Sequence, residues 1–237
     1  MNSIVRAGFE RRNVFNALKA HNVMRHQEVY PLLRQILATR NTPFRLLDIG
    51  CGDGSDIYPI LAESSIDEYF GVDSSGEAIA LAGKKFAGLS CTVHLIHGDY
   101  QEALTIPSAS LDIVWMGLFL HHLEHQQKRE FLLKARSLLK ADGLLVAHDP
   151  LLAKSEDRVA YIARLENYGQ ENWSFLSQEE RAIASQHWSE HGRQERFSTL
   201  RELGLAAGFN DVTLNWSDPE EFYGLVIFRA GFLASTL

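Results

Sequence analysis

The sequence predicts an α/β fold in which a mostly parallel sheet carries helices on both faces. Short apolar runs alternate with amphipathic stretches between residues 44 and 148, and this alternation indicates βαβ units. A glycine-rich turn follows the first apolar run, which is where an open α/β sheet binds its ligands. The chain of 237 residues is 46% hydrophobic, which is enough for the core of one domain.

The individual elements follow from the hydrophobic pattern. Residues 13–40 are expected to be helical, and Pro31 should interrupt this helix or begin a second one. Strands are expected at residues 44–49, 69–72, 91–96, 111–116 and 144–148. Helices are expected at residues 55–63, 75–86 and 124–139, with Pro59 tolerable only near a first turn.

The end of the chain departs from simple alternation. Residues 151–197 are predicted to be largely helical and are rich in large aromatic side chains, so we expect a helical cap inserted into a single domain of residues 1–237. A helix at residues 198–207 and strands at 210–216 and 222–229 should follow. The short connection SDPEE between these two strands implies an antiparallel pair at the sheet edge.

The stretch LLDIGCGDGSD, residues 46–56, places Gly50, Gly52 and Gly54 directly after the first predicted strand. Glycine permits a sharp turn and lets a ligand lie against the backbone, at a cost in conformational entropy. Asp73 in YFGVDSS follows about 20 residues later, where an acid can bind ribose hydroxyls. These spacings favour a nucleotide site over a purely structural turn with a coincidental acid.

The pattern around the turn indicates which nucleotide binds. A dinucleotide fingerprint would need glycine where Ser55 stands, whereas D-x-G-x-G-x-G, beginning at Asp48, resembles class I S-adenosylmethionine-dependent methyltransferases. The segments LIHGDY, LDIVWMGLFLHHL, AAGFNDV and FYGLVIFRA are similar to later motifs of that family, in the same order. ARSLLKADGLLVAHD is also similar, although Ala141 and Asp142 replace the usual proline and first glycine of a turn.

The resemblance implies a Rossmann-like sheet of seven strands in the order 3-2-1-4-5-7-6, with the last strand antiparallel. It implies S-adenosylmethionine as cofactor and S-adenosylhomocysteine as product. Asp48 would help bind the amino group of the cofactor, Asp73 the ribose and Asp99 the adenine amino group, with Tyr100 beside the ring. The full set of predicted cofactor-binding residues is Asp48, Gly50, Cys51, Gly52, Gly54, Asp73, Ser74, Asp99, Tyr100, Met116 and Gly117.

The candidates for catalysis lie just after the fourth strand. His121 and His122 stand on the side where acceptors bind in this family, and histidine can take a proton near neutral pH. The alternative is that this pair only opens a helix and packs against the loop. His148 and Asp149, at the end of the fifth strand, are further candidates.

Two helical segments are expected to enclose the acceptor. Tyr161, Trp173 and Trp188 in the cap are predicted to line its pocket, although ordinary helix packing is the alternative for most of the aromatics there. Residues 1–40 are expected to form a helical lid on the other side, an arrangement that the resemblance suggests.

A metal site is not expected. His121 and His125, like His187 and His191, have the spacing of one helical face. Zinc catalysis would need a third ligand, and neither an HExxH motif nor a cysteine pair accompanies these histidines.

Composition excludes several other classes. The net charge of -7 argues against nucleic acid as a partner, and the longest apolar run, residues 113–120, is too short to span a membrane. The amino terminus lacks the apolar core of a signal peptide. With only two cysteines, no disulfide framework is expected, so the protein should be cytoplasmic. We expect it to be a monomer or a homodimer.

The sequence therefore predicts an S-adenosylmethionine-dependent methyltransferase that acts on an oxygen, nitrogen, sulfur or carbon atom of a small-molecule acceptor. Two alternatives are an NAD-dependent oxidoreductase and a non-catalytic module that only binds S-adenosylmethionine. The position of Ser55 and the antiparallel ending argue against the first.

Overall fold

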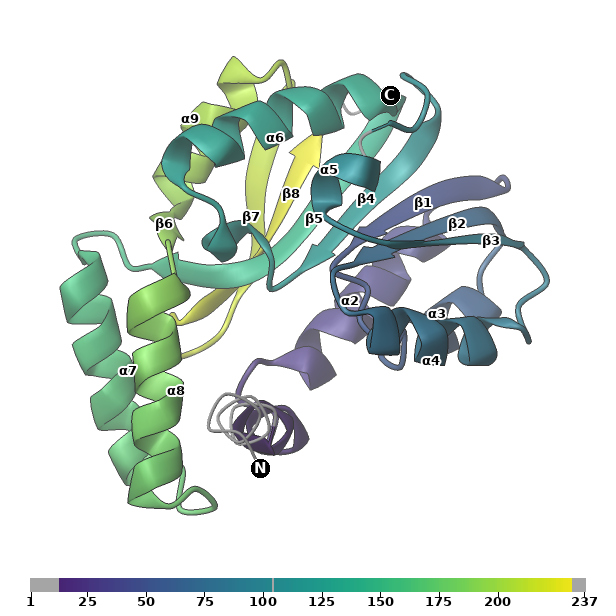
Figure 1. Cartoon of the computed structure of the whole chain (residues 1–237). Coiled ribbons are helices and arrows are strands. Elements are labelled where there is room, and N and C mark those ends of the chain that lie inside the picture. Colours follow the sequence, from purple (N-terminus) through teal and green to yellow (C-terminus); the bar gives the residue numbers. More distant parts are fainter. Residues whose placement is uncertain (1–12, 104, 232–237) are drawn as a thin grey trace.

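The computed structural model describes residues 13–103 and 105–231, and its centre is one sheet (Figure 1). The strand order is β3-β2-β1-β4-β5-β8-β7, and the short β6 pairs with β5 outside this path. The strands are β1 Phe44–Ile49, β2 Ile66–Asp73, β3 Thr92–His97, β4 Leu111–Gly117, β5 Leu139–Leu152, β6 Glu195–Arg196, β7 Asp211–Ser217 and β8 Tyr223–Arg229. Without β6 in the count, this is the predicted order 3-2-1-4-5-7-6.

Strand directions also agree with the prediction. The pairs β2–β3, β1–β2, β1–β4 and β4–β5 are parallel. Strand β8 is antiparallel to both β5 and β7. The parallel part thus has all its carboxyl ends at one edge, which is where the glycine-rich turn lies.

Each face of the sheet has its own hydrophobic core. Successive strand residues point to opposite faces, so Val114 and Ile113 of β4 lie in different clusters. On one face lie α6 His125–Leu138 and α9 Phe197–Ala206, and on the other α2 His26–Ala38, α3 Tyr58–Ala62 and α4 Gly76–Phe86. Burial on both faces explains why β4 and β8 consist almost entirely of buried residues.

The prediction for Pro31 is wrong. Pro31 lies inside α2 and neither begins nor ends it. Pro31 is exposed, so the carbonyl that loses its helical hydrogen bond can bind water instead. The break comes earlier, between helical residues 13–20 and α2, where Asn22 and Arg25 adopt left-handed backbone angles. Pro59 stands in the first turn of α3, as predicted.

Strand β5 is longer than predicted. Leu111 pairs with Leu139 but Ile113 pairs with Leu144, so the strand bulges where the family has a turn. Ala141 and Asp142 lie in this bulge, in place of a proline and a glycine that would favour a turn. The carboxyl end of the strand reaches Leu152 and so carries the chain directly into the cap.

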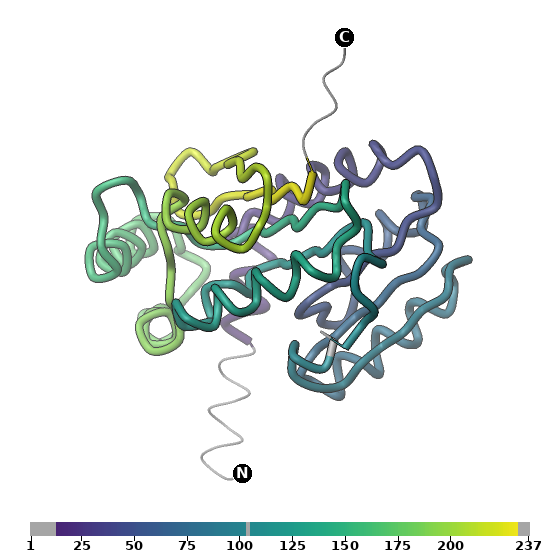
Figure 2. Tube along the Cα trace, turned by 90° about the horizontal axis from the view of Figure 1, so that it is seen from above, coloured from purple at the N-terminus to yellow at the C-terminus, as the bar shows by residue number. Residues whose placement is uncertain are grey.

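The cap consists of α7 Arg158–Asn172 and α8 Gln178–His191, which lie side by side beyond the sheet (Figure 1). In Figure 2 these two helices, in green, lie at one end of the molecule, and α3 and α4, in blue, lie at the other. The cap shares a third hydrophobic cluster with the amino-terminal helical residues. Its buried members are Val14, Leu18, Met24, Tyr161, Leu165, Trp173, Leu176, Ala184, Phe222 and Tyr223.

The assignment of a lid to residues 1–40 and of a single domain to residues 1–237 stays a prediction, and residues 1–12 lie outside the described part. None of the helices within that part has the length and apolar character needed to cross a membrane.

Candidate functional site

A cavity of about 970 Å³ opens at the carboxyl ends of the parallel strands. Gly50 and Gly52 line it after β1, Asp73 at the end of β2, Asp99 after β3 and Gly117 at the end of β4. The cap and the helical residues 13–20 close its other sides. Parallel strands bring these residues together although they are distant in sequence.

The three glycines of the turn differ in what they allow. All three have positive φ, +74° at Gly50, +55° at Gly52 and +69° at Gly54, a conformation that disfavours other residues. A Cβ atom at Gly52 would meet nothing within 4 Å, whereas one at Gly54 would overlap the ring of Phe86. Gly52 therefore leaves space beside the cavity, while Gly54, which does not line it, allows α4 to pack closely.

Asp73 holds the turn in place. Its Oδ2 atom accepts a hydrogen bond from the Gly52 amide at 2.9 Å, and its Oδ1 atom accepts one from the Ser75 amide at 2.8 Å. Each carboxylate oxygen can accept a further hydrogen bond, and the residue lines the cavity beside Ser74. This geometry fits the predicted contact with ribose hydroxyls.

Asp48 lies behind the turn and does not line the cavity. The side chain is buried, and its Oδ2 atom accepts a hydrogen bond from the Tyr69 hydroxyl at 2.8 Å. Burial raises the pKa of Asp48 to about 7, because the charged form loses its hydration. Burial also raises the pKa of the neighbouring Cys51 thiol, which does line the cavity.

The predicted adenine region contains Asp99 and Tyr100, and both line the cavity. Asp99 is exposed and accepts a hydrogen bond from the Gln101 amide at 3.0 Å, at the start of α5 Tyr100–Ala103. Tyr100 packs edge-on against Phe119, with 5.3 Å between the ring centroids. Sequence reasoning missed Phe119, whose only signal is an aromatic residue two positions after the glycine that ends β4. Met116 is fully buried and does not line the cavity.

His121 and Asp149 form a buried pair at the cavity. His121 lies in the 3₁₀ helix Leu120–His122, and its Nδ1 atom is 2.9 Å from Oδ1 of Asp149 at the end of β5. The residues are 8% and 4% exposed, and His121 lines the cavity. Because β4 and β5 are parallel neighbours, the segment that follows β4 lies beside the carboxyl-terminal part of β5, which brings together two candidates that the sequence had suggested separately.

The other two histidine candidates, His122 and His148, both have a lowered pKa. His122 lines the cavity, and burial beside His121, His187 and His191 lowers its pKa to about 3. His148 is fully buried away from the cavity wall, and burial lowers its pKa to about 3 as well. Both imidazoles are therefore neutral at physiological pH. The part of the chain that the structure describes has no group of three His, Cys, Asp or Glu residues that could hold a metal ion.

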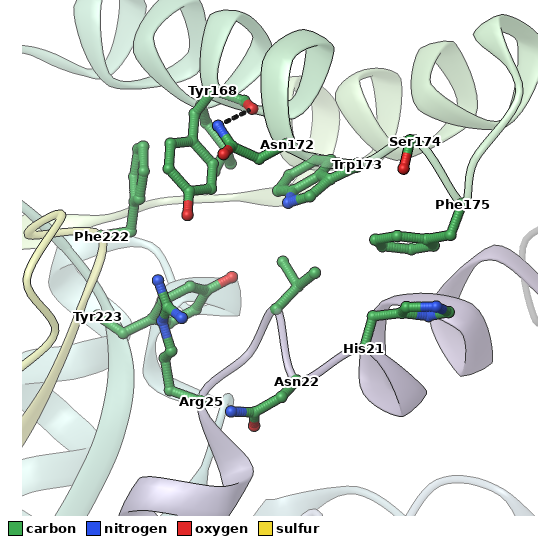
Figure 3. A pocket seen from close by; sticks show the side chains of 12 residues that line it. His21, Asn22, Arg25, Tyr168, Asn172, Trp173, Ser174, Phe175, Phe222 and Tyr223 are labelled. Atoms are coloured by element: carbon green, nitrogen blue, oxygen red, sulfur yellow. Dashed lines mark hydrogen bonds between the residues drawn. The ribbon is translucent and has the colours of Figure 1, made fainter.

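Of the three residues predicted for the acceptor pocket, Tyr161 and Trp188 line the cavity, whereas Trp173 does not. Trp173 packs against Trp188 with 5.5 Å between ring centroids and lines a second cavity of about 420 Å³. Figure 3 shows that second cavity between the segment from His21 to Arg25 and the end of α7. The Trp173 side chain is buried in the core of the cap, and of the two tryptophans only Trp188 faces the main cavity.

The charges around the cavity are unevenly distributed. Five acidic residues line it, Asp53, Asp56, Asp73, Glu77 and Asp99, all near the turn or the ends of β2 and β3. Lys19 is the one lysine or arginine among the described lining residues, and it forms an ion pair with Asp56. No local sequence pattern could have predicted this contact between the amino-terminal helix and the turn. The acidic half fits a cofactor that carries an ammonium and a sulfonium group.

Comparison with known proteins indicates the class of domain that this chain contains. The methyltransferase domain family matches residues 46–143. The release factor glutamine methyltransferase of Caulobacter vibrioides is 37% identical over 73 residues, which cover 30% of this chain and 25% of that protein. The carboxy-S-adenosyl-L-methionine synthase 1 of Yersinia pseudotuberculosis is 22% identical over 120 residues, 45% of either protein. The matched regions thus span a quarter to less than half of these relatives.

The fold has solved counterparts. The structure of a SAM-dependent methyltransferase from Archaeoglobus fulgidus superimposes with a TM-score of 0.62 at 19% sequence identity, over 90% of this chain and 98% of that one. The match of residues 46–143 to a methyltransferase domain, the strand order and the glycine turn together support the class I S-adenosylmethionine-dependent methyltransferase superfamily. The resemblance expected from the sequence is confirmed, and the cofactor of this superfamily is S-adenosylmethionine.

Proposed function

We propose that this protein transfers a methyl group from S-adenosylmethionine to an uncharged small-molecule acceptor, with His121 as the base that removes the proton of the acceptor. The observation that carries the proposal is the buried contact of Asp149 with His121, which lines the cavity that begins at the glycine turn. From the sequence, His121 and His122 could either act as a base or only pack against the loop.

The cofactor supplies an electrophilic methyl group on a sulfonium sulfur. A carboxylate accepts hydrogen bonds, so Asp149 favours the tautomer of His121 with the proton on Nδ1. The Nε2 atom is then free of its proton and can accept one from a hydroxyl, an N–H or a thiol. His122 stays neutral beside it and adds no positive charge that would oppose this transfer.

The cap and the amino-terminal helix would provide placement. Tyr161, Ile183 and Trp188 line the acceptor half with apolar surface, and Val14 and Leu18 do so from the other side. Alignment of the acceptor with the methyl group removes an entropic barrier, worth up to about 7–11 kcal/mol in well-oriented reactions. Exclusion of water from the cavity would also strengthen the interaction of His121 with Asp149.

The lining supports an uncharged acceptor of small size. Lys19 is engaged by Asp56, so no described lysine or arginine in the wall is left to bind a carboxylate or phosphate. A nucleic-acid substrate is disfavoured by the net charge of -7. A cytoplasmic location, suggested by two unpaired cysteines, and a monomeric or homodimeric state remain part of the proposal.

The test measures formation of S-adenosylhomocysteine from S-adenosylmethionine with a panel of small phenols, catechols and heteroaromatic N–H compounds. His121→Gln and Asp149→Asn should each lower the rate with the best acceptor by about 10²–10⁴-fold, because general-base catalysis contributes that much. The affinity for S-adenosylhomocysteine should stay within about twofold of the wild type, since neither change touches the glycine turn.

His94→Gln is the matched control, since His94 is exposed on β3 and does not line the cavity. Full activity of His121→Gln would refute the role of the base. Tight binding of S-adenosylhomocysteine without transfer to any acceptor would favour the non-catalytic alternative.

A further inference from the structure

Gln194 is a buried polar side chain at the cavity that has no hydrogen-bond partner. The residue is 6% exposed and lines the cavity between α8 and β6. Neither its Nε2 nor its Oε1 atom has a partner among the described residues. Native proteins rarely leave a buried amide in this state, because both atoms lose their bonds to water without compensation.

The segment that carries Gln194 is firmly held. The Arg193 amide donates a hydrogen bond to the carbonyl of His121 at 2.6 Å, and Glu195 pairs with Leu151 in the sheet. The buried Lys128 binds both the Arg193 carbonyl and the Glu195 carboxylate. The unpaired amide therefore belongs to a fixed part of the wall, directly beside the residue proposed as the base.

Gly192 keeps room for this side chain. Its φ of -74° is open to any residue, so its backbone conformation does not require glycine. A Cβ atom at Gly192 would overlap Nε2 of Gln194 and also the backbone carbonyl oxygen of Trp188. The absence of a side chain at Gly192 thus leaves room both for the last turn of α8 and for the amide of Gln194.

From these contacts we infer that Gln194 determines acceptor specificity by binding a neutral group with a hydrogen-bond donor next to an acceptor. A carboxamide or a lactam presents this pair, whereas a carboxylate presents acceptors alone and a hydrocarbon presents neither. Because the Arg193 amide binds the backbone of His121, Gln194 lies next in sequence to a residue held against the proposed base. This inference rests on the proposed function, since it assigns the substrate class of the same site.

The probes for a test are 2-hydroxybenzamide, 2-hydroxybenzoate and 2-ethylphenol, which share a phenol and differ in the neighbouring group. Their dissociation constants are measured by calorimetry on protein saturated with S-adenosylhomocysteine, so that no turnover is needed. The wild type should bind the amide at least about tenfold more tightly than either of the other two, because the other two leave the Gln194 amide partly or wholly unpaired.

Two variants separate recognition from packing. Gln194→Leu should abolish the preference for the amide, and Gly192→Ala should weaken it while the glutamine itself is retained. Gln186→Leu on the exposed face of α8 is the control and should keep the preference. The affinity for S-adenosylhomocysteine should be unchanged in all three variants.

Absence of the preference in the wild type, including no binding of the amide, overturns the inference. So does a preference that survives in Gln194→Leu, which would assign Gln194 a purely structural role. His121→Gln should retain the preference in binding. If it does while no methyl transfer is found in the wild type, the proposed function fails and the specificity role of Gln194 stands.

Discussion

Asp48 shows how a single buried group can make this fold sensitive to pH. The carboxyl group is enclosed, and its one hydrogen-bond donor among the described residues is the Tyr69 hydroxyl. Burial raises the pKa of Asp48 from 3.8 to about 7, so the folded protein holds a proton that the unfolded chain has already lost. In the folded protein, a negative charge behind the turn is therefore only about half formed near neutral pH.

The pH dependence of stability should reveal this proton. A raised pKa in the folded state stabilises the protein at low pH, and this contribution falls as the pH rises from about 4 to about 7. Relative to Asp48→Asn, the free energy of unfolding of the wild type should fall by up to about 4 kcal/mol across this range. Urea unfolding between pH 5 and 7.5 measures most of the change. Parallel pH profiles for the two proteins would contradict it.

In the turn between β1 and α3, glycines with similar backbone angles have different surroundings. Gly52 and Gly54 both have positive φ, but only Gly52 faces open space at the cavity. Sequence alone could predict the turn and the kind of ligand, because the spacing of glycines and acids reflects what the ligand needs. It could not predict which glycine serves the ligand and which serves α4, because that depends on where Phe86 packs.

A matched pair of substitutions should separate these two roles. Gly52→Ala and Gly54→Ala each incur the backbone cost of a left-handed residue, about 1–2 kcal/mol. Gly52→Ala should also raise the dissociation constant of S-adenosylhomocysteine at least about tenfold, because its methyl group occupies the space where a ligand meets the backbone. Gly54→Ala should lose a further ~1–3 kcal/mol of stability through overlap with Phe86.

Calorimetry and urea unfolding on both variants make the comparison. An equal loss of cofactor affinity in two equally stable variants would mean that the two glycines are equivalent.

Some other features of the fold and the site could be predicted from the sequence, and some could not. The strands were predictable because β1 and β4 are short apolar runs with turns on both sides. The position of Pro31 inside α2 was not predictable, because a helix tolerates an internal proline there only where the proline faces solvent. The His121–Asp149 pair was only partly predictable, since it needs β4 and β5 to be neighbours. Gln194 could not be predicted from the sequence, because only the structure shows that its buried amide has no hydrogen-bond partner among the described residues.

At the scale of the whole molecule, the cavity is closed by two segments that are far apart in sequence. Val14 and Leu18 pack in one cluster with Tyr161 and Ala184 of the cap. Lys19 adds an ion pair to Asp56, which ties the amino-terminal helix to the turn. Half-exposed ion pairs contribute about 0–1 kcal/mol, so the shared apolar cluster is the main link between residues 13–20 and the helices α7 and α8.

This link should be visible in hydrogen exchange. Saturation with S-adenosylhomocysteine should slow amide exchange in residues 13–20 and in α8 together, because both line the cavity and share a cluster. Helix α9, which packs on β7 and α6, should be unaffected. Mass spectrometry of peptides from the three segments measures the effect. Slower exchange in residues 13–20 without any change in α8 would show that the two move separately.

The cluster that joins these segments also bears on how a new specificity could be engineered. A graft of residues 151–197 onto the sheet of another methyltransferase would leave Tyr161 and Ala184 without Val14 and Leu18. The transplanted helices would then expose apolar surface and lose one wall of their pocket. Under the proposed function, acceptor preference is therefore transferable only as a pair of segments that are far apart in the chain.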